Sequence, residues 1–146
     1  MRVFRRLPRG SRLAFFAAIA LNPVFERVLH RRGVGPARDL ATRLGGHRAF
    51  GVSSAYDVHR ARRLWTGVML ATRVGPADVV CLPRSLTLWT LLRRRGVPAD
   101  LVIGVDPGKP GIGAHAWVNI AGVAVGEEPA HVASLHTFND ALLGGA

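Results

Sequence analysis

The chain has 146 residues, of which 49% are hydrophobic and 20% charged, and this composition predicts a globular protein rather than a disordered one. Its formal net charge of +11 comes almost entirely from arginine. That excess favours either a solvated basic surface or a surface that binds an acidic peptide, a nucleic acid or an anionic membrane. The single cysteine excludes an intramolecular disulfide and favours a reducing, cytoplasmic setting.

The first half of the chain, residues 1–74, has helical periodicity. Residues 11–31 predict one helix that Pro23 kinks or interrupts. The apolar run LAFFAAIAL within it is too short to span a bilayer, which needs about 20 apolar residues. We therefore expect a buried or surface-docking helix, and membrane-surface association is possible but not favoured. Pro36 fits the first turn of a short helix that ends at Gly45-Gly46.

A third helix is predicted to run to about Thr72, with Ser53 or Ser54 as its N-cap. One face of this helix is apolar at helical spacing and is expected to point inward. That stripe consists of Ala55, Val58, Leu64, Trp65, Val68 and Met69. The opposite face is basic, with Arg60, Arg62 and Arg63, and we expect it to be solvated.

The second half, residues 75–146, has a different pattern. It opens with a helix that begins at Cys81 and ends with arginines before Gly96, which is favourable chemistry for a helix end. Three strands follow, and a tight turn at Ala121-Gly122 joins the last two of them. A short helix is predicted near residues 137–143. The predicted strands are Leu101–Val105, Ala114–Ile120 and Val123–Gly126.

These elements predict one α+β domain over residues 1–146, in which one helix packs on a small antiparallel sheet and the first-half helices surround it. Pro83 determines where the central helix begins, because proline is tolerated in the first helical turn and costly later. Cys81 therefore lies at the helix N-terminus. The macrodipole and the free N–H groups there stabilise a thiolate, and the same groups can stabilise an oxyanion.

His115 is the predicted base for this thiol. It opens the strand Ala114–Ile120 and shares a face with Trp117 and Asn119, while its two alanine neighbours leave room for another group to approach. A helix that packs on the sheet brings residue 81 near residue 115. This is the geometry that Cys–His catalysis requires.

Glu127 is the candidate third residue, because it lies across the predicted hairpin from His115 and can orient the imidazole. Asn119 shares the His115 face but lies on the same strand, where it is less well placed to accept from the ring. The remaining histidines show no metal-ligand spacing, and no phosphate-binding glycine motif is present. We therefore expect catalytic residues Cys81, His115 and Glu127, with no metal and no cofactor.

The segments CLPRSLTLWTLLRRRGVPADLVIGV and GAHAWVNIAGVAVGE resemble the transglutaminase-like leader peptidases of lasso-peptide biosynthesis. In this resemblance the two catalytic positions fall on Cys81 and His115. It implies a papain/transglutaminase-like core over residues 75–146, with a helical region before it. The family's third residue is typically the aspartate of an Asn-Asp pair, whereas Gly126-Glu127 stands at that place here.

The resemblance implies a cysteine peptidase that removes the leader from a ribosomally made precursor peptide. It also implies two partners besides that precursor: a separate leader-recognition protein, since a chain of this length leaves no room for a fused one, and a lasso cyclase. Two alternatives stay open. One is a transglutaminase-like acyltransferase, in which an amine rather than water resolves the thioester. The other is a non-catalytic basic adaptor for a peptide or nucleic acid, which the lack of a nucleic-acid motif disfavours.

Overall fold

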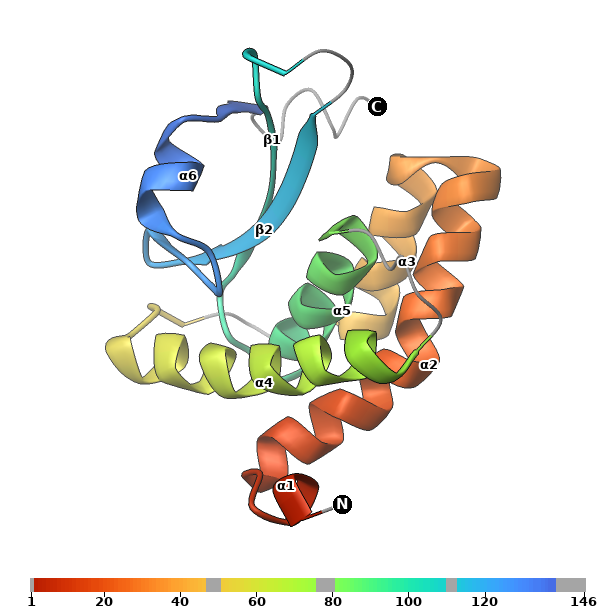
Figure 1. Cartoon of the computed structure of the whole chain (residues 1–146), viewed down its shortest axis with the longest axis vertical. Helices are drawn as coiled ribbons and strands as arrows, with labels where there is room; N and C mark the ends of the chain where they lie inside the picture. The colour runs from red at the N-terminus through yellow and green to blue at the C-terminus, as the bar shows by residue number, and fades with distance from the viewer. Residues whose placement is uncertain (1, 47–50, 76–80, 110–112, 139–146) are drawn as a thin grey trace.

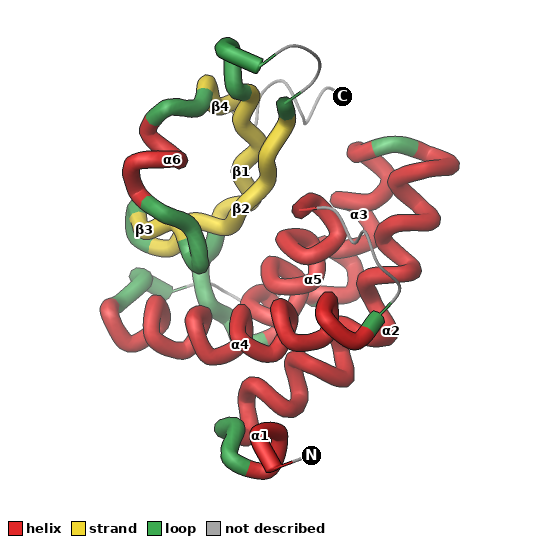
Figure 2. Tube along the Cα trace, viewed as in Figure 1, coloured by secondary structure: helices red, strands yellow, loops and turns green. Residues whose placement is uncertain are grey.

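A layer of helices packs beside a small sheet in this protein (Figure 1), and one short helix, α6, lies with the strands rather than with the other helices (Figure 2). The computed structural model describes residues 2–46, 51–75, 81–109 and 113–138. The described helices are α1 (Arg2–Arg5), α2 (Arg9–Arg32), α3 (Val34–Gly45), α4 (Ala55–Val74), α5 (Cys81–Arg94) and α6 (Pro129–Ala133). This arrangement confirms the predicted α+β class.

The α2 helix is continuous through Pro23, so the expected interruption does not occur. Ala14, Ala18 and Phe25 are fully buried on the two sides of the proline. Packing of α2 against α3, α4 and α5 therefore stabilises both halves of the helix. Thr87 on α5 also donates a 2.7 Å hydrogen bond to the Asn22 side chain, and both residues are buried.

Of the residues that the structure describes, α2 alone forms a helix long and apolar enough to cross a membrane, judged by length and composition only. The helix has 24 residues and extends well beyond the nine-residue run LAFFAAIAL, which by itself is too short to span a bilayer. The same length and composition are found in core helices of soluble proteins and in signal sequences.

The α4 helix begins with a complete capping box, in which Ser54 and Asp57 bond reciprocally, so the predicted cap is confirmed at Ser54. Its inward stripe is confirmed at Val58, Leu64 and Val68, which are buried. Ala55 is exposed, contrary to the prediction, because it is the first residue of the helix and lies beyond the packed face.

The sheet contains four antiparallel strands in the order β3-β2-β1-β4: β1 (Asp100–Val105), β2 (Ala114–Ile120), β3 (Val123–Ala124) and β4 (His136–Phe138). The third strand is shorter than predicted. The helix expected near 137–143 is wrong at residues 137–138, which pair with β1 instead, and residues 139–143 lie outside the described ones. Residues 137–138 form a strand because the edge of β1 has N–H and C=O groups that need hydrogen-bond partners.

The central helix is α5, which is buried on nearly every side from Pro83 to Leu92. It contacts α2, α3 and α4 on the helical side and β1 and β2 on the other. Val118 and Ile120 of β2 join Leu86, Leu88 and Leu92 of α5 in one hydrophobic core. This packing places the first turn of α5 against the start of β2.

Candidate active site

The thiol of Cys81 lies at the first residue of α5 and is half-buried. Its Sγ is 3.9 Å from the carbonyl oxygen of Ala114, the residue that precedes His115. One turn further along α5, the buried Ser85 hydroxyl donates a 2.9 Å hydrogen bond to the carbonyl of Ala116. The residues on either side of His115 are therefore both contacted by the N-terminal end of α5.

His115 lies on the face of β2 that also carries Trp117 and Asn119, as the alternation of a strand predicts. Its ring stacks on the Trp117 indole, with centroids 5.9 Å apart. The Trp117 Nε1 donates a 3.0 Å hydrogen bond to the Asn119 side-chain oxygen. Asn119 is thus engaged by Trp117, which leaves the imidazole to another partner.

That partner is Glu127, whose Oε2 lies 3.0 Å from His115 Nε2. Both side chains are largely buried, with 24% of His115 and 15% of Glu127 exposed. Nε2 has no aligned hydrogen bond among the described residues, so the contact is one of close approach between an acid and an imidazole. Because Nε2 faces the carboxylate, Nδ1 is the nitrogen left for a thiol or a substrate.

A glycine at position 126 is required for this approach. Its φ is +76°, in the left-handed region, and a Cβ built on it would overlap the Trp65 indole of α4. The helical layer therefore packs directly on the backbone beside Glu127. An asparagine at position 126 would tolerate the left-handed backbone, but its side chain would not fit under Trp65.

No hydrogen bond joins the Cys81 thiol to the His115 ring within the described residues. The thiol reaches the backbone at the start of β2, and the imidazole lies on the Trp117 face one residue later. Catalytic hydrogen bonds are often long in the absence of substrate and tighten when it binds. The imidazole lies on the face of β2 that carries Trp117, whereas α5 packs on the face that carries Val118 and Ile120.

Two residues near this constellation were not singled out from the sequence. The ring of His131, on α6, packs edge-on against His115 with centroids 5.4 Å apart. Arg84 lies one turn after Cys81 and its Nη1 contacts the Met69 sulfur at 3.6 Å, while its buried Nε has no partner among the described residues. In the sequence CLPRSL, Arg84 stands three positions after the cysteine, and this spacing is the signal that could have identified Arg84 from the sequence.

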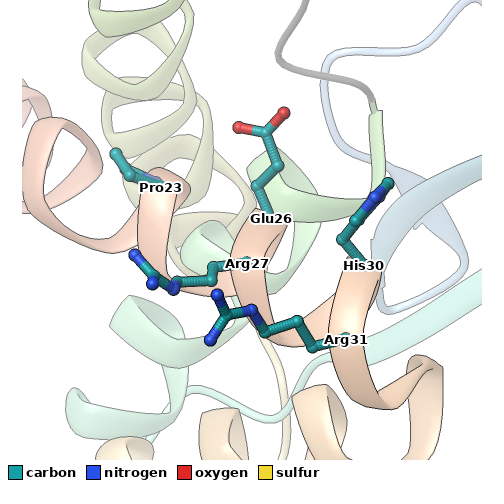
Figure 3. Close-up of a pocket in the computed structure, with 5 residues that line it drawn as sticks. All are labelled: Pro23, Glu26, Arg27, His30 and Arg31. Carbon is teal, nitrogen blue, oxygen red and sulfur yellow. The ribbon is translucent and has the colours of Figure 1, made fainter.

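A wide hollow lies on the C-terminal half of α2 (Figure 3). Its volume is about 560 Å³, and it is lined by Pro23, Glu26, Arg27, His30 and Arg31. Arg27 and Arg31 project one way, whereas Glu26 and His30 project another. All five residues come from one helix, so the hollow is an open surface. In the described ranges, no group of three or more His, Cys, Asp or Glu side chains could hold a metal ion.

A cysteine at the start of a buried helix and a histidine paired with an acid on the adjoining antiparallel sheet define the framework of thiol-dependent acyl chemistry. The family model of the transglutaminase-like superfamily matches residues 24–140. The chain therefore belongs to the transglutaminase-like superfamily, whose members are typically cysteine-dependent enzymes. No curated protein and no solved structure matches the chain significantly.

Proposed function

We propose that this protein is a cysteine peptidase that removes the leader peptide from a lasso-peptide precursor. The observation that carries the proposal is the convergence of three groups on the start of β2. The Cys81 thiol lies 3.9 Å from the Ala114 carbonyl, and the adjoining His115 has its Nε2 3.0 Å from Glu127. The resemblance of the Cys81 and His115 segments to leader peptidases supports the choice of substrate.

The reaction begins when the Cys81 thiolate attacks the scissile carbonyl carbon and forms a C–S bond. Protonated His115 then gives its proton to the leaving amine, which is the new N-terminus of the core peptide. The leader remains as a thioester on Cys81. Water attacks this thioester while His115 takes its proton, and the free leader acid departs as the thiol is restored. Glu127 orients the imidazole and stabilises its charged form.

The test is cleavage of a lasso precursor peptide by the purified protein, with and without the leader-recognition protein encoded with that precursor. Mass spectrometry should find two products, a leader with a free carboxylate and a core with a free amine. The Cys81→Ala variant should bind the precursor and give neither product. Cleavage by Cys81→Ala at the wild-type rate would exclude the proposal.

Membership of the transglutaminase-like superfamily favours one second candidate, acyl transfer. Here an amine, rather than water, attacks the same Cys81 thioester, and the product is an amide. The two reactions differ in product mass, because hydrolysis adds the elements of water and transfer adds the amine with no water. A product mass that shifts when a primary amine is added would assign the protein to the transferases.

A further inference from the structure

An arginine-lined cavity lies where the start of α2, the first half of α4 and the end of α5 meet. Its volume is about 280 Å³. Four arginines line it: Arg9 from α2, Arg60 and Arg63 from α4, and Arg95, which directly follows α5. The basic face of α4, expected to be merely solvated, therefore forms part of a built concave surface.

The positive charge of this cavity is largely uncompensated by the described lining residues, none of which is acidic. Asp57 lies 4.0 Å from Arg60, but its carboxylate also accepts from the Ser54 backbone and hydroxyl in the capping box of α4. Burial lowers the pKa of Arg95, and the charges of Arg60 and Arg94 lower it further. A bound anion would relieve this repulsion among the arginines.

The start of α2 adds to the positive potential. Pro8, Arg9 and Gly10 line the cavity, the N-cap Pro8 provides no side-chain acceptor, and the first turn contains no acidic residue. The free N–H groups and the positive end of the α2 dipole therefore lie beside the arginines. Planar guanidinium groups bind carboxylates in bidentate fashion, so several of them in one cavity select a ligand with more than one negative charge.

We propose that this cavity binds neighbouring carboxylates of an acidic peptide segment. Several residues that line the cavity are partly or fully exposed, and this favours a peptide over a small free anion as the ligand. Tyr56, which is 67% exposed, presents its ring beside Arg60, and the exposed Pro8 offers apolar surface for a peptide backbone. The occupant is thus a segment with two or more Asp or Glu residues and an apolar or aromatic neighbour.

The cavity lies at the opposite end of α5 from Cys81. Arg95 follows Cys81 by 14 positions in the chain, which at 1.5 Å per position places the two residues about 21 Å apart. An extended peptide needs about six residues to cover this distance. If the proposed peptidase activity is correct, a substrate with an acidic segment at least that far from its cleavage site could occupy both places at once. The binding proposal itself does not depend on that activity.

The experiment measures fluorescence anisotropy of a labelled peptide of sequence Gly-Glu-Glu-Trp-Asp-Glu-Gly with the full chain at about 50 mM salt, where surface charge acts strongly. A peptide with Gln and Asn in place of the acids is the first control. We expect the double variant Arg9→Gln/Arg63→Gln to lose about tenfold or more in affinity, because two guanidinium–carboxylate contacts are removed. The matched control is Arg27→Gln/Arg31→Gln, which removes the same charge from the α2 hollow of Figure 3 and should change affinity less than about twofold.

An equal loss in the two double variants would overturn the proposal, since it would show attraction by net charge instead of a site. The proposal would also be overturned if the control peptide with Gln and Asn bound as tightly as the acidic peptide. Displacement by inorganic phosphate at concentrations similar to the peptide's would show a simple anion site and reject the peptide. Binding to phosphatidylserine vesicles without binding to the peptide would reject it in favour of a membrane. Because no cleavage is measured, none of these results bears on the Cys81 proposal, which Cys81→Ala tests by itself.

Discussion

The two ends of α5 differ in the chemistry that gathers around them. At the N-terminal end the Cys81 thiol contacts the start of the strand that carries the His115–Glu127 pair, and at the C-terminal end Arg95 shares a cavity with three other arginines. The helix macrodipole favours both arrangements, because its N-terminus stabilises an anion such as a thiolate and its C-terminus stabilises cations. One buried helix can thus orient a reacting group at one end and a binding surface at the other.

The largest expected effect on this comparison comes from His115→Ala. Loss of the group that transfers protons in both half-reactions should lower the cleavage rate by roughly 10²- to 10⁴-fold. Affinity for the acidic peptide at the other end of α5 should not change. The initial rate of leader release, followed by mass spectrometry, is the measurement. His136→Ala, at an exposed position of β4, is the control and should retain its rate. A similar loss of rate in both variants would show that cleavage does not depend specifically on His115.

Gly126→Ala should be the variant that harms the fold most. The new Cβ would overlap Trp65 and would require a left-handed backbone, and overpacking together with this strain should cost about 2–4 kcal/mol of unfolding free energy. Urea denaturation followed by tryptophan fluorescence measures it.

Gly122→Ala separates the two causes of that loss. Gly122 has nearly the same φ, +77°, but a Cβ there meets nothing within 4 Å. Its substitution should therefore cost only the backbone contribution, about 1 kcal/mol. Equal losses at the two glycines would show that contact with Trp65 has no part in holding Glu127 in place.

Glu127→Gln should have a smaller effect on cleavage than His115→Ala. The amide keeps the size of the side chain but no longer stabilises a charged imidazole, so we expect a loss of about 10- to 100-fold, less than for a triad aspartate. Glu127→Asp retains the charge and shortens the side chain by one methylene. Single-turnover rates should place Glu127→Asp above Glu127→Gln. An unchanged rate in Glu127→Gln would remove Glu127 from the catalytic residues.

The smallest effect is expected from Ser85→Ala, which removes the hydrogen bond that joins α5 to β2 beside His115. Thr87→Val removes the bond from α5 to Asn22 of α2 and leaves the sheet untouched. Each should cost about 1–2 kcal/mol of stability in thermal unfolding. Only Ser85→Ala should also lower the cleavage rate, by a few-fold. If both variants lower it equally, the rate reflects overall stability rather than the contact between α5 and β2.

Local physical chemistry made several elements predictable. The hairpin turn was expected at Ala121-Gly122, and both residues have positive φ values there, 50° and 77°. The bounds of β2 were predicted as they are observed, because apolar residues alternate along it between glycine-rich segments. The elements that were missed, α1, α6 and β4, are short and have weak patterns. The edge of β1 gives β4 its place, and that edge is not a property of β4's own residues.

The sequence by itself determined the start of α5 at Cys81, because Pro83 is tolerated only in a first helical turn. It also determined the strand that carries His115 and the family to which the chain belongs. The predicted hairpin had already placed Glu127 opposite His115, but only the tertiary structure decided that Trp65 covers Gly126 and that arginines from three segments share one cavity. These contacts join residues far apart in the chain, and packing around a shared core, rather than local backbone preference, brings them together. Their roles in catalysis and binding stay predictions that the variants above can test.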